Sequence, residues 1–142
     1  MTGIDLHNGK FYLNGQFFQP QIETELVNSH TVGKNLYSNI SMNGEVKNIP
    51  FIATGYYKNK KLKSITLIIE SEYLKASYHP PKDVDFRDYL TSYIDFWKNL
   101  IEELINHLVN SNKRKFEWGK VQVQVDPRDH IVYGEIKYNR DK

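Results

Sequence analysis

The most regular pattern of hydrophobic and polar positions in this chain lies between Val84 and Asn110. At about 100° per residue, one side of a helix over this range collects apolar side chains and the opposite side collects charged and amide side chains. The apolar side holds Phe86, Leu90, Tyr93, Ile94, Trp97, Leu100, Ile101, Leu104, Ile105 and Leu108. Acids just before this range suit the positive end of a helix dipole, and the cationic exit at 110–115 suits its negative end. The pattern therefore predicts a helix over 84–110, roughly 40 Å long, that needs a packing partner of similar length.

Segments on both sides of this helix alternate with a period of two, which is typical of strands. Between Ser64 and Glu70, three apolar residues share one face while Ile68 lies on the other. This segment is predicted to be a central strand, covered at least partly on both faces. A polar tip at 58–61 separates it from a preceding strand at 51–57.

The C-terminal part is predicted to form a hairpin. Alternating valines at 121–125 give one strand, and 131–138 returns antiparallel after a proline-containing turn at 126–129. Phe116 and Trp118 have the opposite parity to these valines, so Gly119 is predicted to form a bulge that corrects the register.

Two Asn-Gly pairs lie between apolar runs, and Asn-Gly is a strong signal for a tight hairpin turn. The pair at 14–15 predicts a hairpin of about 10–13 with 16–19, and the pair at 43–44 predicts another between 36–42 and 45–49. Helical spacing over 21–30 predicts one or two turns of helix. The segment 72–78 is predicted to extend the strands before the prolines that precede the long helix.

These elements define an α+β fold class with one domain spanning 1–142. We expect an antiparallel sheet of about five to seven strands, with the helix at 84–110 packed across one face. The alternation of polar residues leaves the other face partly polar, so that this face, or an edge of the sheet, is available to a partner.

Composition narrows the functional classes. The chain has no cysteine, which excludes disulfides, thiolate zinc sites and cysteine nucleophiles. With 19 basic and 17 acidic residues the net charge is +2, which gives no electrostatic argument for nucleic acid or a membrane. The start of the sequence has no secretory pattern and no apolar run is long enough for a membrane helix, so a cytoplasmic protein is predicted.

No motif assembles catalytic or cofactor chemistry. The five histidines form no metal-binding spacing, and the glycines form no phosphate-binding loop, so no metal and no cofactor are predicted. The carboxylate pair Glu102 and Glu103, and the pair Asp126 and Asp129 that brackets a turn, are expected on the surface. A hydrolase or small-molecule pocket near Glu70, Glu72 and His79 remains an alternative.

Ten tyrosines are difficult to bury, because each phenol needs a hydrogen-bond partner. They either lie half-buried at strand edges or, for a few of them, form a protein-binding face, where Tyr is enriched. The first interpretation is therefore a non-enzymatic domain that binds another protein, with its oligomeric state open. In size, tyrosine content and mixed charge such a domain resembles the immunity proteins and inhibitors that neutralise bacterial toxins, which implies a protein partner. The candidate partner-binding residues are Tyr56, Tyr57, Lys58, Lys60, Lys61, Lys63, Tyr133 and Tyr138.

The second interpretation is a single-stranded nucleic-acid-binding protein. The lysines of 56–63, joined in space by 113–115, could meet phosphates, and the tyrosines could stack on bases. Solubilising lysines at a hairpin tip, which also protect strand edges, explain the same pattern and are favoured because the chain is nearly neutral.

Overall fold

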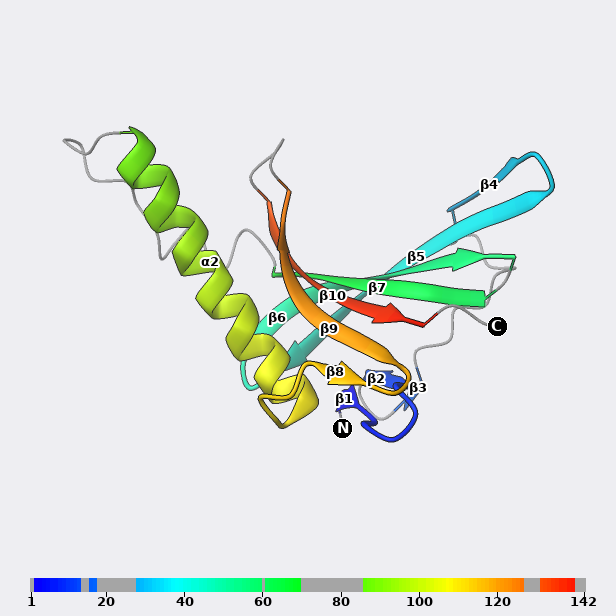
Figure 1. Cartoon of the computed structure of the whole chain (residues 1–142), viewed down its shortest axis with the longest axis horizontal. Coiled ribbons are helices and arrows are strands. Elements are labelled where there is room, and N and C mark those ends of the chain that lie inside the picture. Colours follow the sequence, from blue (N-terminus) through cyan, green and yellow to red (C-terminus); the bar gives the residue numbers. More distant parts are fainter. Residues whose placement is uncertain are drawn as a thin grey trace.

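The computed structural model describes residues 2–13, 16–17, 28–59, 61–69, 86–126 and 131–139. They form one long helix, a three-stranded sheet and a seven-stranded sheet, all antiparallel (Figure 1). The small sheet contains β1 (Gly3–Ile4), β2 (Phe11–Leu13) and β3 (Gln16–Phe17). The large sheet contains β4 (Asn28–Val32), β5 (Asn35–Val46), β6 (Ile49–Lys58), β7 (Lys61–Ile69), β8 (Lys115–Phe116), β9 (Gly119–Val125) and β10 (Val132–Tyr138).

The large sheet has the strand order β4-β5-β6-β7-β10-β9-β8. Strands that follow one another in sequence are neighbours, except that β10 rather than β8 lies beside β7. The helix α2 (Phe86–Val109) comes between β7 and β8 in the chain. The predicted α+β class, the long helix, described here over Phe86–Val109, and an antiparallel sheet within the expected five to seven strands are confirmed.

Helix α2 packs on β9 and β10 and reaches β1 and β5, while the β4–β5 hairpin extends away from it (Figure 1). The buried residues of its C-terminal half are Ile101, Leu104, Ile105, Leu108 and Val109. Full burial of each such side chain stabilises the fold by about 1.5–3 kcal/mol. The helix ends at Asn110, which has a positive φ of 55° and donates its N–H to Asn106 O at 2.7 Å.

The small sheet packs beside α2, on the same face of the large sheet. The ring of Phe11 lies edge-on to Phe51 at 6.4 Å, and Leu13 lies against Gly44 of β5. The turn between β1 and β2 contacts the turn between β8 and β9, where Trp118 Nε1 donates a hydrogen bond to Leu6 O at 2.9 Å. Helix, small sheet and large sheet therefore share one hydrophobic core.

The predicted turn at Asn43-Gly44 is wrong, because both residues lie inside β5. The chain turns instead at Lys47 and Asn48, whose φ angles are 50° and 67°. Glycine at position 44 is required by packing: a Cβ there would lie 2.6 Å from both Leu13 Cδ2 and Phe51 Cζ.

Two smaller predictions also fail. Residues 28–30 belong to β4 and not to a helix over 21–30, whose remaining residues lie outside the described part. Gly119 is not a bulge but the first residue of β9, paired with Phe116 across a two-residue turn. A Cβ on Gly119 would overlap Lys137 O, so the close approach of β10 accounts for this glycine.

Three strand predictions are confirmed. The strand β2 pairs with β3, β7 lies centrally between β6 and β10, and β9 pairs with β10 along its whole length. The predicted turn at 14–15, the predicted turn at 126–129 apart from Asp126, and the predicted strand at 72–78 lie outside the described residues.

Candidate interaction surface

The large sheet has one covered face and one face on which none of the described elements packs, called here the open face. Alternation along β6 shows the difference: Phe51, Ala53 and Tyr57 are buried, whereas Tyr56 is 42% exposed. On β7, Ile68 has the same outward parity and is 37% exposed, and none of the described elements provides the partial cover predicted on this side. The strand registers then assign every described residue of the sheet to one of the two faces.

The open face is organised in rows that cross the strands. One row is apolar, with Ile52 directly opposite Ile68, and Tyr133 follows on β10. The next row is polar and neutral except for one carboxylate; it contains Ser41, Thr54, Thr66, Glu135 and Gln122.

Side chains of this polar row bind one another. Ser41 Oγ and Thr54 Oγ1 are 2.8 Å apart, and Gln122 Nε2 donates to Glu135 Oε1 at 2.7 Å. These hydrogen bonds fix the middle of the face between the apolar row and the opposite end of the sheet.

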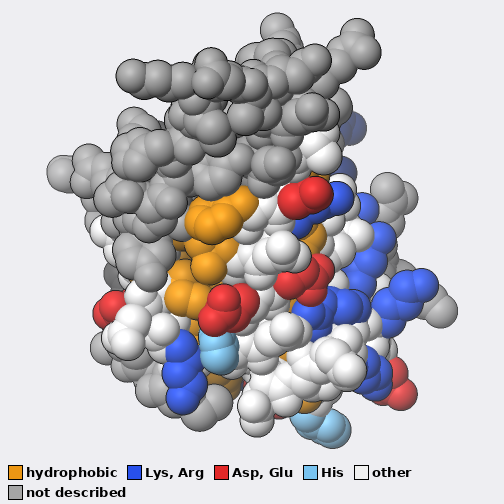
Figure 2. All heavy atoms as spheres, turned by 90° about the vertical axis from the view of Figure 1, so that its left-hand side faces the viewer, with side chains coloured by type: hydrophobic (Ala, Val, Ile, Leu, Met, Phe, Trp, Pro, Cys, Tyr) orange, Lys and Arg blue, Asp and Glu red, His pale blue; other side chains and the backbone are white. Residues whose placement is uncertain are grey.

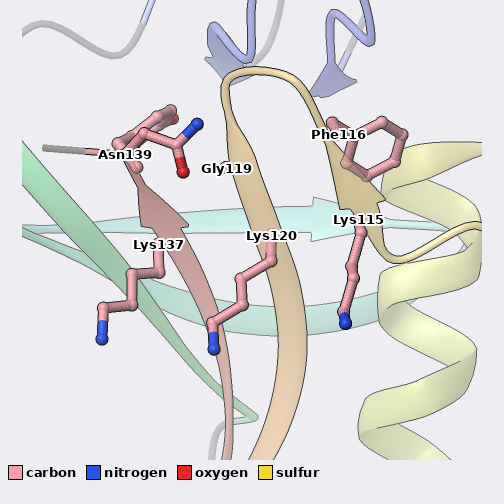
Figure 3. A pocket seen from close by; sticks show the side chains of 7 residues that line it. Lys115, Phe116, Gly119, Lys120, Lys137 and Asn139 are labelled. Carbon is pink, nitrogen blue, oxygen red and sulfur yellow. The ribbon is translucent and has the colours of Figure 1, made fainter.

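That opposite end carries a basic row. Lys115, Lys120 and Lys137 lie directly opposite one another on β8, β9 and β10. The row continues on β7 and β6 with Ser64 and Tyr56. Figure 3 shows the three lysine side chains side by side and pointing the same way, whereas Phe116 points away from them.

The four candidate tyrosines are divided between the two faces. Tyr56 and Tyr133 lie on the open face, and Tyr57 and Tyr138 lie on the covered face. Burial raises the pKa of Tyr133, and Glu135, Asp126 and Tyr56 add to this effect.

The covered-face tyrosines belong to the core. Burial raises the pKa of both Tyr57 and Tyr138, and Tyr57 adds to the effect on Tyr138. Tyr138 donates its hydroxyl to Gly9 O at 2.7 Å. Tyr57 is buried, so a partner could reach it only if the core opened, whereas Tyr138 is half-buried and keeps part of its surface exposed.

The candidate lysines lie close to the β6–β7 turn. Lys58 and Lys61 are paired across it on the open face, Lys63 occupies a bulge opposite Tyr56 and Tyr57, and Lys60 lies outside the described residues. The structure therefore brings Tyr56, Lys58 and Lys61 to one end of the open face.

The basic segment at 113–115 joins this face only through Lys115. Lys113 Nζ lies 5.2 Å from the centroid of the Phe116 ring. Arg114 binds Glu102 on α2 at 2.7 Å and also donates to Asn106. Arg114 therefore fastens the helix end to the segment that enters β8, and Lys113 covers the Phe116 ring.

Sequence reasoning missed Lys120 and Lys137 as members of a surface. The sequence did carry one indication: each of the two lysines alternates with the inward-facing apolar residues of its strand. Parity alone places them on the outer face, but only the register of β9 with β10 places them opposite each other.

The titratable residues of the described part form no catalytic arrangement. Glu103 pairs with His107 at 3.7 Å along the helix, and His30 stacks on Tyr37 with ring centroids 5.5 Å apart. No cluster of three or more His, Asp or Glu side chains that could hold a metal occurs in the described ranges. The alternative pocket at Glu70, Glu72 and His79 lies outside them.

The helix side of the molecule has a different character. Figure 2 shows acidic and basic side chains interspersed there around a band of hydrophobic surface. Within the described chain, no helix has the length and apolarity that a membrane span requires.

Comparisons with known proteins give no relative. The chain matches no family model, and neither the curated proteins nor the solved structures contain a significant match.

Proposed function

We propose that this protein is a non-enzymatic interaction domain that binds another protein through the open face of its sheet. The observation that carries the proposal is the one-sided packing: the helix and the small sheet lie on one face, and apolar side chains remain exposed on the other. An inhibitor or immunity-type role is the finer form of this proposal.

The size of the open face fits a protein interface. Seven strands at about 4.8 Å spacing make it about 29 Å wide, and its strands, which contain 2 to 12 residues, average about 25 Å in length at about 3.3 Å per residue. Its area is therefore on the order of the 800 Å² that one partner contributes to a standard interface.

The apolar row supplies the centre that such an interface needs. Ile52 and Ile68 are adjacent on β6 and β7, Tyr133 lies on the next strand, and hydrogen-bonding side chains border them. Protein interfaces combine a more apolar centre with a polar rim, and tyrosine is enriched in them. We place the interaction in the cytoplasm, where a domain without disulfides is at no disadvantage.

Threonine substitutions in the apolar row test this proposal. Ile52→Thr with Ile68→Thr keeps two β-branched residues on the strands but removes most of the apolar surface. Tagged protein is recovered from native cells after nuclease treatment, and its partners are quantified by mass spectrometry. We expect one stoichiometric partner with the unmodified protein and at least a tenfold loss with the double variant.

Val32→Thr is the matched control, because Val32 is a 60% exposed β-branched residue at the far edge of the same face. A partner retained fully by the double variant, or lost equally by the control, would refute the assignment to the apolar row.

A further inference from the structure

The basic row places like charges directly opposite one another, and one pair of them, Lys115 with Lys120, lies where an antiparallel sheet brings side chains closest. Arg114 O accepts a hydrogen bond from Val121 N at 2.9 Å, so the next pair along the two strands, Lys115 with Lys120, is a non-hydrogen-bonded pair. Side chains of such pairs approach more closely than those of hydrogen-bonded pairs, and like charges opposite each other destabilise a sheet.

Neighbouring acids do not neutralise this row. None of Lys115, Lys120 and Lys137 forms an ion pair with another residue of the described chain. Protection of a sheet edge accounts for Lys115 on the edge strand β8, but Lys120 and Lys137 lie on interior strands. The three lysines line a hollow of about 390 Å³ that is open to solvent.

Aromatic and neutral polar side chains lie beside the three lysines at this end of the open face. Ser64 and the 42% exposed Tyr56 follow Lys137 in the same row. The adjacent row holds Lys61, Lys58, Tyr37 and His30, and the last two rings are stacked. The positions named in these two rows carry no acid.

We propose that this end of the open face binds single-stranded nucleic acid, with Lys115, Lys120 and Lys137 contacting phosphates and Tyr56 stacking on a base. Cationic side chains beside exposed aromatic rings are the combination that such ligands require. Among the described elements, this face presents no helix that could enter a duplex groove. An acidic protein segment would use the lysines but would leave the aromatic platform without a role.

The proposed binding of nucleic acid is separate from the proposed protein interaction and uses different residues. Tyr56 and Ile52, like Ser64 and Ile68, are four residues apart on one strand, which separates the two rows by about 13 Å. Substitutions in one row therefore leave the other row intact, and the two proposals can fail separately.

Fluorescence anisotropy with the purified full chain and labelled oligothymidylate of about 20 nucleotides tests the proposal. Three phosphate contacts predict that log K falls with log salt with a slope of about −2 between about 50 and 200 mM salt. The variant Lys120→Glu with Lys137→Glu should bind at least tenfold more weakly. Lys120→Arg with Lys137→Arg should bind normally.

The control variant reverses the same number of charges elsewhere. Lys47→Glu with Lys98→Glu alters two exposed lysines away from the basic row, and either double reversal changes the net charge from +2 to −2. Tyr56→Ala should weaken binding at least about fivefold and Tyr56→Phe should preserve it, because stacking needs only the ring. Thermal unfolding of each variant confirms that it is folded.

Three results would overturn the proposal: no binding at low salt, equal losses in the two charge-reversed variants, or no effect of Tyr56→Ala. Equal binding of polyglutamate would also overturn it and would assign the lysines to an acidic protein. None of these four results depends on the apolar row, so the protein-interaction proposal is judged by its own experiment.

Discussion

Two tyrosines at the same end of the covered face differ in how their hydroxyls are bonded. Tyr138 donates to Gly9 O at 2.7 Å, which ties the N-terminal turn to the last strand. The hydroxyl of Tyr57 and that of its cross-strand partner Ser38 are buried, and neither finds a hydrogen-bond partner among the described residues. A buried polar group without a partner costs free energy, whereas a satisfied one contributes a modest net gain.

Phenylalanine substitutions at these two positions should therefore have different effects. Tyr57→Phe should leave the free energy of unfolding unchanged or raise it by up to about 1 kcal/mol, because it removes a buried hydroxyl that lacks a partner. Tyr138→Phe should lower it by about 1 kcal/mol, because Gly9 O loses its donor. Urea unfolding measures the free energy of both variants. A larger loss for Tyr57→Phe than for Tyr138→Phe would contradict the conclusion that only the Tyr138 hydroxyl is hydrogen-bonded.

The same two phenols predict a loss of stability in alkali. Burial raises their pKa values above the ordinary value of about 10, so the folded state keeps protons that the unfolded state releases. The unfolding free energy should be insensitive to these groups below pH about 10 and should fall as pH rises beyond it.

Thermal unfolding from neutral pH to above about pH 10 checks this sign. The double variant Tyr57→Phe with Tyr138→Phe should show a weaker decline than the unmodified chain. An identical decline in both proteins would assign the alkaline instability to other groups.

At the scale of elements, the long helix was predictable because its apolar period repeats over many turns and both ends carry suitable charges. The turn after β5 was not, because local preference and packing conflicted there. Asn43-Gly44 has turn chemistry, but Gly44 lies inside the strand, packed against its cross-strand partner Phe51 and against Leu13 of the small sheet, which is distant in the sequence.

Substitutions at the observed turn, Lys47-Asn48, and at Gly44 should distinguish the effect of turn preference from the effect of packing. Replacing Lys47-Asn48 by Asn-Gly puts residues suited to positive φ at both turn positions and should raise the unfolding free energy by about 1 kcal/mol. Gly44→Ala should lower it by about 1–3 kcal/mol through overpacking. Chemical denaturation measures both effects; a stabilised Gly44→Ala variant would exclude the packing explanation.

The surface residues were predictable only in part for a related reason. Tyr57 shares the parity of Phe51 along β6, which was the available signal that it faces the core. The basic row could not be derived, because three short segments of the C-terminal half fix its members through the register of β8, β9 and β10. Register depends on pairing across strands, which the sequence of one strand does not specify.

At the scale of the whole molecule, the two faces of the large sheet have different roles. One face packs against α2 and the small sheet and forms the core. The other presents an apolar row, a hydrogen-bonded polar row and a basic row in succession across its strands. This separation allows a protein partner and an anionic ligand to use different ends of one surface.

Photo-cross-linking in native cells tests the central claim, that the open face is the binding surface. A photoreactive amino acid is placed at Ile68 on the open face and, in a second protein, at Asp95 on the exposed side of α2. The account predicts one discrete protein adduct from position 68 and none from position 95. An adduct from position 95 alone would place the partner on the helix side and contradict the account.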